Sequence, residues 1–295
     1  MDYERFKEKM IKKIKNLAPG EMRNYRIKVE TRYKVNETLD ALTFVPMETS
    51  GRMRAYPVFY LQELYDLYLA GNSLERIGRY VVSMLREVPS DEVIETGTFA
   101  PDNMKEQVIL QLINYERNIQ LLADIPHRRF LDLAVIYRSV IQYDEDKWSS
   151  MIVTNETMEE WGVTEDELYQ QALEYTSRRF PFVLKDTGRM FGSGIVVEHG
   201  QRRMHFLTTE LMKFGAAAML YPDILKMAAD IYGSGFAILP GSIHELYLIK
   251  DTPECAAAWK EAVVCANSEL VHPAEYLSDS VYYYNCDDGT INILL

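Results

Sequence analysis

Apolar residues recur every three or four positions in several stretches of the chain, and this spacing predicts amphipathic helices. The first such helix is expected to end before Pro19 and Gly20, which break helices. Another is expected to begin at Leu74, and a third should follow Thr164, where Glu167 completes a capping box. The apolar face of the first helix consists of Phe6, Met10, Ile14 and Leu17.

Other stretches alternate apolar and polar residues or are rich in β-branched and aromatic side chains, and these predict β-strands. Residues 203–209 and 215–221 are predicted to form a hairpin, and "ILPGSIHEL" (residues 238–246) is predicted to be one core strand. A final hairpin should turn at "DDG", residues 287–289. The remaining expected strands cover residues 24–35, 39–47, 56–60, 106–114, 128–144 and 148–155.

Runs of consecutive strands between helices predict an α+β fold with mixed, mainly antiparallel sheets and flanking helices. The polar stretch "VPSDEVIETGTFAPD" (residues 88–102) contains proline and shows no periodicity, which is typical of a linker. We therefore predict an N-terminal α+β region over residues 1–98 and a C-terminal α+β domain over residues 99–295. The glycine-rich segment 186–200 is predicted to be a long loop or a hairpin insertion, and no role is assigned to it.

Composition places the chain among globular proteins, because 47% of its 295 residues are hydrophobic. Charges run through the first 20 residues, so no secretory signal is predicted. No stretch approaches the roughly 20 apolar residues that a membrane span needs, and we predict a cytoplasmic protein. The three cysteines lack the spacing of a zinc site and are expected to be unpaired thiols that pack as small core residues.

The net charge of −12 is distributed unevenly. Residues 1–34 hold eleven basic and five acidic residues, whereas residues 252–295 hold one basic and seven acidic residues. A basic segment can contact an acidic partner or nucleic acid. No aromatic RNA-binding motif follows it, so nucleic acid is the less favoured partner, and a solvated helix and hairpin is the expected structure.

Known catalytic motifs are absent from the sequence. His244 and Glu245 begin like a zinc-protease motif, but Leu248 stands where the second histidine would be. There is no glycine-rich phosphate loop and no Gly-x-Ser-x-Gly turn. The five histidines complete no plausible set of metal ligands, so we predict no metal site and no cofactor.

The densest group of polar residues lies between residues 114 and 132. Asp132 is expected to be partly buried on a strand and would need a partner, which His127 or Arg129 could supply. This group fits either a salt-bridged strand entrance or a ligand site. If residues 238–246 form a strand, alternation places His244 and Glu245 on opposite faces, where the two would not act at one centre.

The chain contains the motifs "LINYERN", "IPHRRFLDLAV", "IVTNETMEEWGVTEDELYQQA", "GAAAMLYPDILKMAADIYGSGFAILPGSIHEL" and "LSDSVYYYN". Together these motifs resemble the bacterial domain-of-unknown-function family fifty-six eighty-eight. That family has no assigned activity, catalytic residue or cofactor, so the resemblance implies a family and no mechanism. The family usually has a serine where Gly241 stands here. If that serine were essential for a reaction, its replacement would count against activity.

A protein-binding or regulatory module without catalytic activity is the expected function. The grounds are the lack of a recognisable catalytic set and the tyrosine-rich composition, which suits recognition of another protein. The alternative is a hydrolase or transferase with a polar cleft. The candidate catalytic residues are His127, Asp132, His244 and Glu245, and the candidate binding residues are Asn114, Asn118, Arg128, Arg129 and Asp279.

Overall fold

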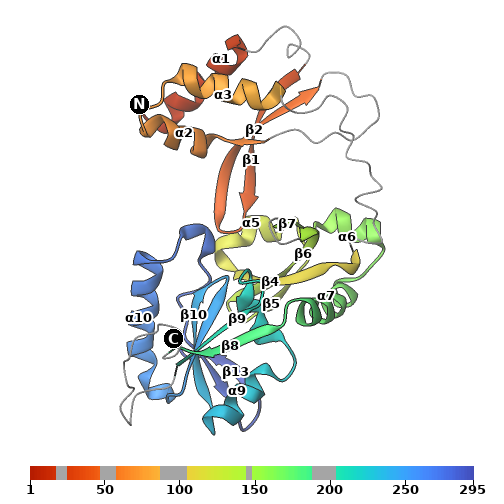
Figure 1. Ribbon diagram of the computed structural model, residues 1–295, viewed down its shortest axis with the longest axis vertical. Helices are drawn as coiled ribbons and strands as arrows, with labels where there is room; N and C mark the ends of the chain where they lie inside the picture. Colours follow the sequence, from red (N-terminus) through yellow and green to blue (C-terminus); the bar gives the residue numbers. More distant parts are fainter. Residues whose placement is uncertain (18–24, 47–57, 87–104, 144–147, 188–203) are drawn as a thin grey trace. The chain divides into compact units, whose positions relative to one another are not determined.

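The computed structural model describes residues 1–17, 25–46, 58–86, 105–143, 148–187 and 204–295 (Figure 1). The chain forms two compact units. The first consists of Met1–Lys34 and Thr38–Ala100, and the second of Val35–Glu37 and Pro101–Leu295. The predicted linker and residues 188–200 of the glycine-rich segment lie outside the described residues.

In the described part of the first unit, three helices pack against a three-stranded sheet in the order β1-β2-β3. Phe6, Met10 and Ile14 of the first helix are fully buried, as their helical spacing predicts. They pack in one cluster with Leu42 of the sheet and Val81 of the third helix. The elements are α1 (Tyr3–Leu17), β1 (Tyr25–Lys34), β2 (Glu37–Pro46), β3 (Phe59–Tyr60), α2 (Leu61–Leu69) and α3 (Leu74–Arg86).

The second unit contains a six-stranded sheet in the order β13-β12-β10-β11-β9-β8. It also contains a four-stranded sheet in the order β4-β6-β5, in which β7 pairs with β6 as well. The strands are β4 (Val108–Asn114), β5 (His127–Phe130), β6 (Leu133–Tyr143), β7 (Trp148–Ile152), β8 (Phe182–Asp186), β9 (Met204–Thr209), β10 (Phe236–Ser242), β11 (Glu245–Ile249), β12 (Tyr282–Asn285) and β13 (Thr290–Ile293).

Helices flank both sheets of this unit. Helix α7 packs against β4, and α10 packs against β10, beside which Figure 1 draws it. The helical elements are η2 (Glu116–Asn118), α5 (Ile119–Leu122), α6 (Asn155–Trp161), α7 (Glu165–Arg179), η3 (Gly215–Leu220), α9 (Ile224–Tyr232), η4 (Pro253–Cys255), α10 (Ala256–Glu269) and η5 (Pro273–Glu275). The predicted α+β fold with mainly antiparallel sheets is confirmed.

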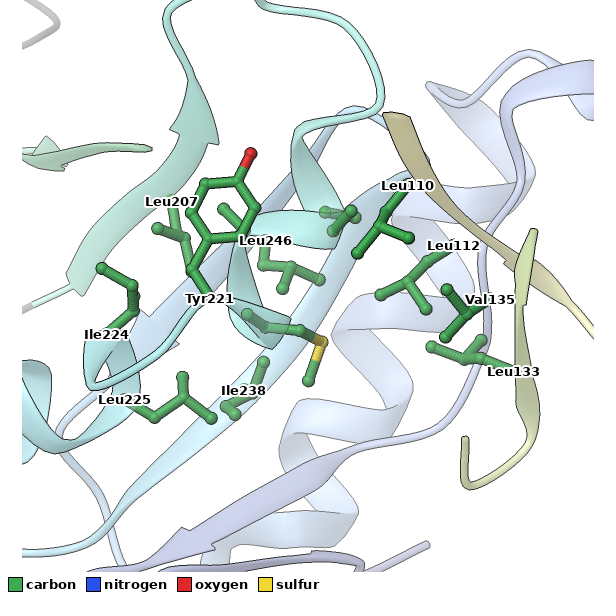
Figure 2. Close-up of a cluster of buried hydrophobic side chains, with 14 of the residues drawn as sticks. Leu110, Leu112, Leu133, Val135, Leu207, Tyr221, Ile224, Leu225, Ile238 and Leu246 are labelled. Atoms are coloured by element: carbon green, nitrogen blue, oxygen red, sulfur yellow. The ribbon is translucent and has the colours of Figure 1, made fainter. Parts of the chain in front are cut away.

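The main core of the second unit lies where the inner faces of its two sheets meet. Figure 2 shows side chains from β4 and β6 facing side chains from β9, β10 and β11. Burying a side chain of this size contributes about 1.5–3 kcal/mol. The labelled contributors from the strands are Leu110, Leu112, Leu133, Val135, Leu207, Ile238 and Leu246.

The prediction that residues 215–221 form a strand is wrong, because Gly215–Leu220 is a buried 3-10 helix. A Cβ atom on Gly215 would lie 2.1 Å from Thr208 Oγ1 and 2.4 Å from the His244 carbonyl oxygen. Three alanines follow, and alanine favours helical over strand conformation. The small side chains let this helix fit into the main core, where the sequence predicted the second strand of a hairpin.

Two other predicted strands are hairpins. The predicted strand 128–144 contains a turn between β5 and β6, in which Leu131 has a φ of 58°, in the left-handed region. Residues 238–246 turn between β10 and β11, next to a register shift between Pro240 and Ser242. The first turn, at Leu131 and Asp132, has no strong turn signal. The second turn, at Ile243 and His244, follows a Pro-Gly signal that the prediction of one continuous strand did not use. The prediction of buried cysteines is also wrong, because Cys265 and Cys286 are exposed.

Candidate functional site

Asp132 lies in the turn between β5 and β6 and accepts hydrogen bonds from three hydroxyl groups. Ser278 and Tyr282 donate at 2.6 and 2.7 Å, and Ser280 donates at 2.9 Å. Ser278, Ser280 and Tyr282 stand at every second position of the segment that leads into β12, and all three hydroxyl groups reach the same carboxylate. Burial, together with the charge of Asp132, raises the pKa of Tyr282 well above its ordinary value. The carboxylate is therefore held by neutral donors that keep their protons.

Three asparagine side chains hold the chain that leads into these hydroxyl groups. Asn36 donates to the carbonyl oxygens of Ala274 and Tyr276, and Asn114 donates to that of Leu277. Asn118 links the two other asparagines, because its amide group donates to Asn36 Oδ1 and to the Asn114 carbonyl oxygen. The predicted binding residues Asn114 and Asn118 are thus buried and bonded to backbone.

His244 lies in the turn between β10 and β11 rather than on a strand. Its Nδ1 accepts the backbone N–H of Phe214 at 3.0 Å, and its Nε2 lies 3.4 Å from Glu275 Oε1. Its carbonyl oxygen accepts the hydroxyl group of Thr208. Because Nδ1 is an acceptor, the hydrogen-bond network assigns the proton of the neutral ring to Nε2, which faces the carboxylate. The neutral ring can therefore donate only through Nε2, and the Phe214 N–H already occupies the lone pair on Nδ1.

Glu245 follows directly, at the start of β11, where it pairs with Ser242. Burial raises the pKa of its carboxyl group, and the charge of Glu275 acts in the same direction. Gly241 makes room for this group, because a Cβ atom there would lie 2.8 Å from Glu245 Oε1 and 2.8 Å from the Tyr247 ring. A serine side chain at position 241 would contact the Glu245 carboxylate.

The remaining predicted residues have separate partners. His127 Nδ1 contacts the Ile125 carbonyl oxygen at 3.0 Å. Arg128 forms an ion pair with Glu165 at 2.7 Å and lies over the Tyr169 ring. Arg129 bonds to the Leu131 carbonyl oxygen and lies over Tyr115, and Asp279 accepts a bond from Asn267.

The structure therefore brings four of the nine candidates to one segment, Pro273–Tyr282. Asp132, Asn114 and Asp279 bond to this segment or lie in it, and His244 approaches it through Glu275. His127 and Arg128, on β5, have the separate partners described above. The residues that sequence reasoning missed are Glu275, Ser278, Ser280, Tyr282 and Phe214. The alternation of hydroxyl residues in "SDSVY" was the available signal for three of them.

Among the described residues, no group of three or more histidine, cysteine, aspartate or glutamate side chains is placed to hold a metal ion. In the same part of the chain, no helix is long and apolar enough to cross a membrane.

Fold and site define an α+β protein of two units, with a polar network around one segment of the second unit. The model of the "Family of unknown function (DUF5688)" matches residues 3–286, so the chain belongs to this family. The family suggested by the sequence motifs is thus confirmed. No curated protein and no solved structure matches the chain.

Replacing Glu245 with glutamine is expected to make stability less sensitive to pH. With a raised pKa in the folded state, Glu245 holds its proton longer in the folded than in the unfolded chain. The wild type therefore loses stability as pH rises from about 4.3 through the raised pKa, and E245Q avoids this loss. Urea unfolding followed by tryptophan fluorescence near pH 4 and pH 7 measures the difference.

The control is E254Q, because hydrogen bonding at Thr252 lowers the pKa of Glu254. This carboxylate stabilises the folded chain above its unfolded pKa, so E254Q should lose stability relative to the wild type as pH rises. As pH rises, the stability of E245Q relative to the wild type should increase, whereas that of E254Q should decrease. If the stability of the wild type and of E245Q changed with pH in the same way, the raised pKa assigned to Glu245 would be wrong.

Proposed function

We propose that this protein acts by binding a partner protein, and that an extended acidic segment of the partner adds to the free edge of β1. The open edge of β1 carries the proposal. In the described part of the chain β1 pairs only with β2. An unpaired strand edge presents backbone donors and acceptors that a second extended chain can satisfy.

The side chains of β1 suit an acidic partner. Four of them are basic, namely Arg26, Lys28, Arg32 and Lys34, and one, Glu30, is acidic. Lys28 and Arg32 both pair with Glu30, so the strand keeps a net positive charge after these pairs form. Complementary charge directs association and selects between partners.

Alternate positions on β1 are apolar and exposed. Val29 is 39% exposed and Tyr33 is 41% exposed, and Thr31 lies between them. These three residues point to one side of the strand, because side chains alternate. An added strand could pack apolar side chains there while its acidic side chains meet the basic row.

The polar residues of the second unit support binding over catalysis. The lone pair of His244 is taken by a backbone N–H, and the carboxylate of Asp132 is held by three hydroxyl groups. Both side chains therefore already hold neighbouring parts of the fold, which favours a structural role for them. The cytoplasmic location and the low preference for nucleic acid stay predictions.

Fluorescence anisotropy with labelled peptides tests the proposal. We expect a pool of ten-residue peptides that alternate valine or threonine with glutamate to bind the full chain. The same peptides with lysine in place of glutamate should bind weakly. Peptides with N-methylated backbone amides should also bind weakly, because they cannot extend the sheet.

A pair of charge reversals locates the site. R26E, on β1, is expected to weaken binding of the acidic peptides several-fold, in keeping with about 1 kcal/mol for an exposed charge. R79E, on α3 in the same unit, changes the net charge equally and should leave binding unchanged. Equal binding of acidic, basic and N-methylated peptides would overturn the proposal, as would no binding of the acidic pool.

A further inference from the structure

Arg138 and Gln111 lie together on one face of the four-stranded sheet. Arg138 is on β6 opposite Ile109 of β4, and Gln111 is opposite Ile136. This face is opposite to the one that carries Leu110 and the other core residues of Figure 2. Gln111 is only 1% exposed, and Arg138 is half-buried.

Two apolar clusters occupy the same face on either side of this polar pair. One contains Ile113 and Ile136 with residues of α5, and the other contains Ile109, Val140 and Phe180. A guanidinium group between apolar clusters is partly removed from water, and this burial lowers the pKa of Arg138 to about 10. A buried charge of this kind costs stability unless a counter-charge is near.

The partners of Arg138 are neutral. Its Nε donates to Ser150 Oγ at 2.9 Å, and one Nη donates to the Ser150 carbonyl oxygen at 3.2 Å. The other Nη contacts Gln111 Oε1 at 3.4 Å. Among the described residues, no carboxylate lies within ion-pair distance of Arg138. A guanidinium has five N–H donors, so two remain after these three contacts.

Gln111 adds further donors at the same place. Its amide oxygen faces Arg138, and its amide nitrogen has no hydrogen-bond partner within the described residues. Oxygen and nitrogen are assigned here by the bond to Arg138, since the oxygen is the atom that can accept. One positive charge and several N–H donors therefore converge without an anionic acceptor.

An aromatic ring closes one side of this group. The guanidinium carbon of Arg138 lies 5.1 Å from the centre of the Phe214 ring. The loop that carries this ring holds two residues in the left-handed region, Met212 at φ 55° and Phe214 at φ 55°. Strain of this kind in residues other than glycine persists only where the surroundings enforce it, and it gathers at binding sites.

We propose that Arg138 and Gln111 form a binding site for a small oxyanion, a carboxylate or a phosphate group, next to the Phe214 ring. The oxyanion accepts the two remaining guanidinium N–H groups, and a further bond comes from the amide group of Gln111. Arginine binds both kinds of anion through paired hydrogen bonds. The bound charge compensates a guanidinium group for which the described residues supply no carboxylate.

Calorimetric titration of the full chain with sodium phosphate, sodium acetate and sodium benzoate tests this proposal. Sodium chloride at equal ionic strength is the reference. We expect saturable binding of phosphate or of the carboxylates beyond the chloride response. The anion that binds more tightly identifies the chemical group. Arg138→Met should weaken this binding at least tenfold, whereas Arg129→Met, an exposed residue on β5 of the same sheet, should leave it unchanged.

Gln111→Glu keeps the proposal testable if Arg138→Met does not fold. The new carboxylate would sit at the position of the amide oxygen that already faces Arg138. We expect Q111E to unfold at a higher temperature than the wild type in chloride and to lose oxyanion binding. The proposal is overturned if the wild type shows no saturable binding, or if R138M or Q111E binds the oxyanion as the wild type does.

Discussion

Replacing Gly215 with alanine is expected to cause the largest loss of stability in the second unit, about 3 kcal/mol or more. The added Cβ would lie 2.1 Å from Thr208 Oγ1, 2.4 Å from the His244 carbonyl oxygen and 2.8 Å from the Thr209 nitrogen. Two of these atoms are backbone and cannot move without shifting a strand or a turn. Overpacking of a rigid site costs 1–3 kcal/mol and occasionally more.

Urea unfolding followed by tryptophan fluorescence measures this effect in the correct unit, because Trp148, Trp161 and Trp259 all lie in the second unit. Gly162→Ala is the control. Nothing lies within 4 Å of a Cβ there, and only its positive φ of 65° is unfavourable. Gly162→Ala should lower the free energy of unfolding by about 1 kcal/mol. A loss for G215A no greater than that for G162A would contradict the close approach at Gly215.

Replacing Asp132 with alanine is also expected to lower the free energy of unfolding strongly, by about 3 kcal/mol or more. Ser278, Ser280 and Tyr282 would lose their common acceptor, and each buried polar group left without a partner costs about 1–3 kcal/mol. Tyr282 is fully buried and cannot turn to solvent. The same fluorescence-detected unfolding measures the loss.

Asp279→Ala is the matched control for this second prediction. Asp279 lies in the same segment, but its carboxylate accepts one described side-chain bond, from Asn267. It should cost about 1 kcal/mol. If D132A and D279A had equal effects, the three hydroxyl groups would not depend on Asp132, and the role assigned to the segment Pro273–Tyr282 would be wrong.

Local patterns predicted those parts of the fold that depend on local chemistry. The capping box of Thr164 and Glu167 is present at the start of α7, and the apolar face of α1 is buried. The strand at residues 106–114 is β4. These features need only neighbouring residues in the chain, so their pattern is sufficient.

The errors arose where distant contacts decide the conformation. The alanine run after Gly215 favours a helix, but the burial of this helix between strands of both sheets depends on contacts that are distant in the chain. His244 is in a turn because its ring and carbonyl group bond to Phe214 and Thr208, more than 25 positions away in the chain. Tertiary contacts of this kind override local preference.

The sequence predicted the candidate site only in part, as it did the fold. Asp132 was expected to need a partner, and it has three, but they are hydroxyl groups 146–150 residues away rather than His127 or Arg129. Glu275 was missed because nothing in the sequence brings it near His244. Arg138 was missed because a single arginine in an apolar strand shows neither its burial nor the lack of a carboxylate near it among the described residues.

Hydrogen exchange of the β1 amides tests the binding proposal most directly. Free edge amides exchange rapidly, whereas amides that pair with an added strand are protected. With the acidic peptide pool bound, residues 26–34 are expected to gain protection while α3 stays unchanged. If the peptide bound without added protection in β1, or protected another element instead, the partner would not extend this sheet and the proposed binding mode would be wrong.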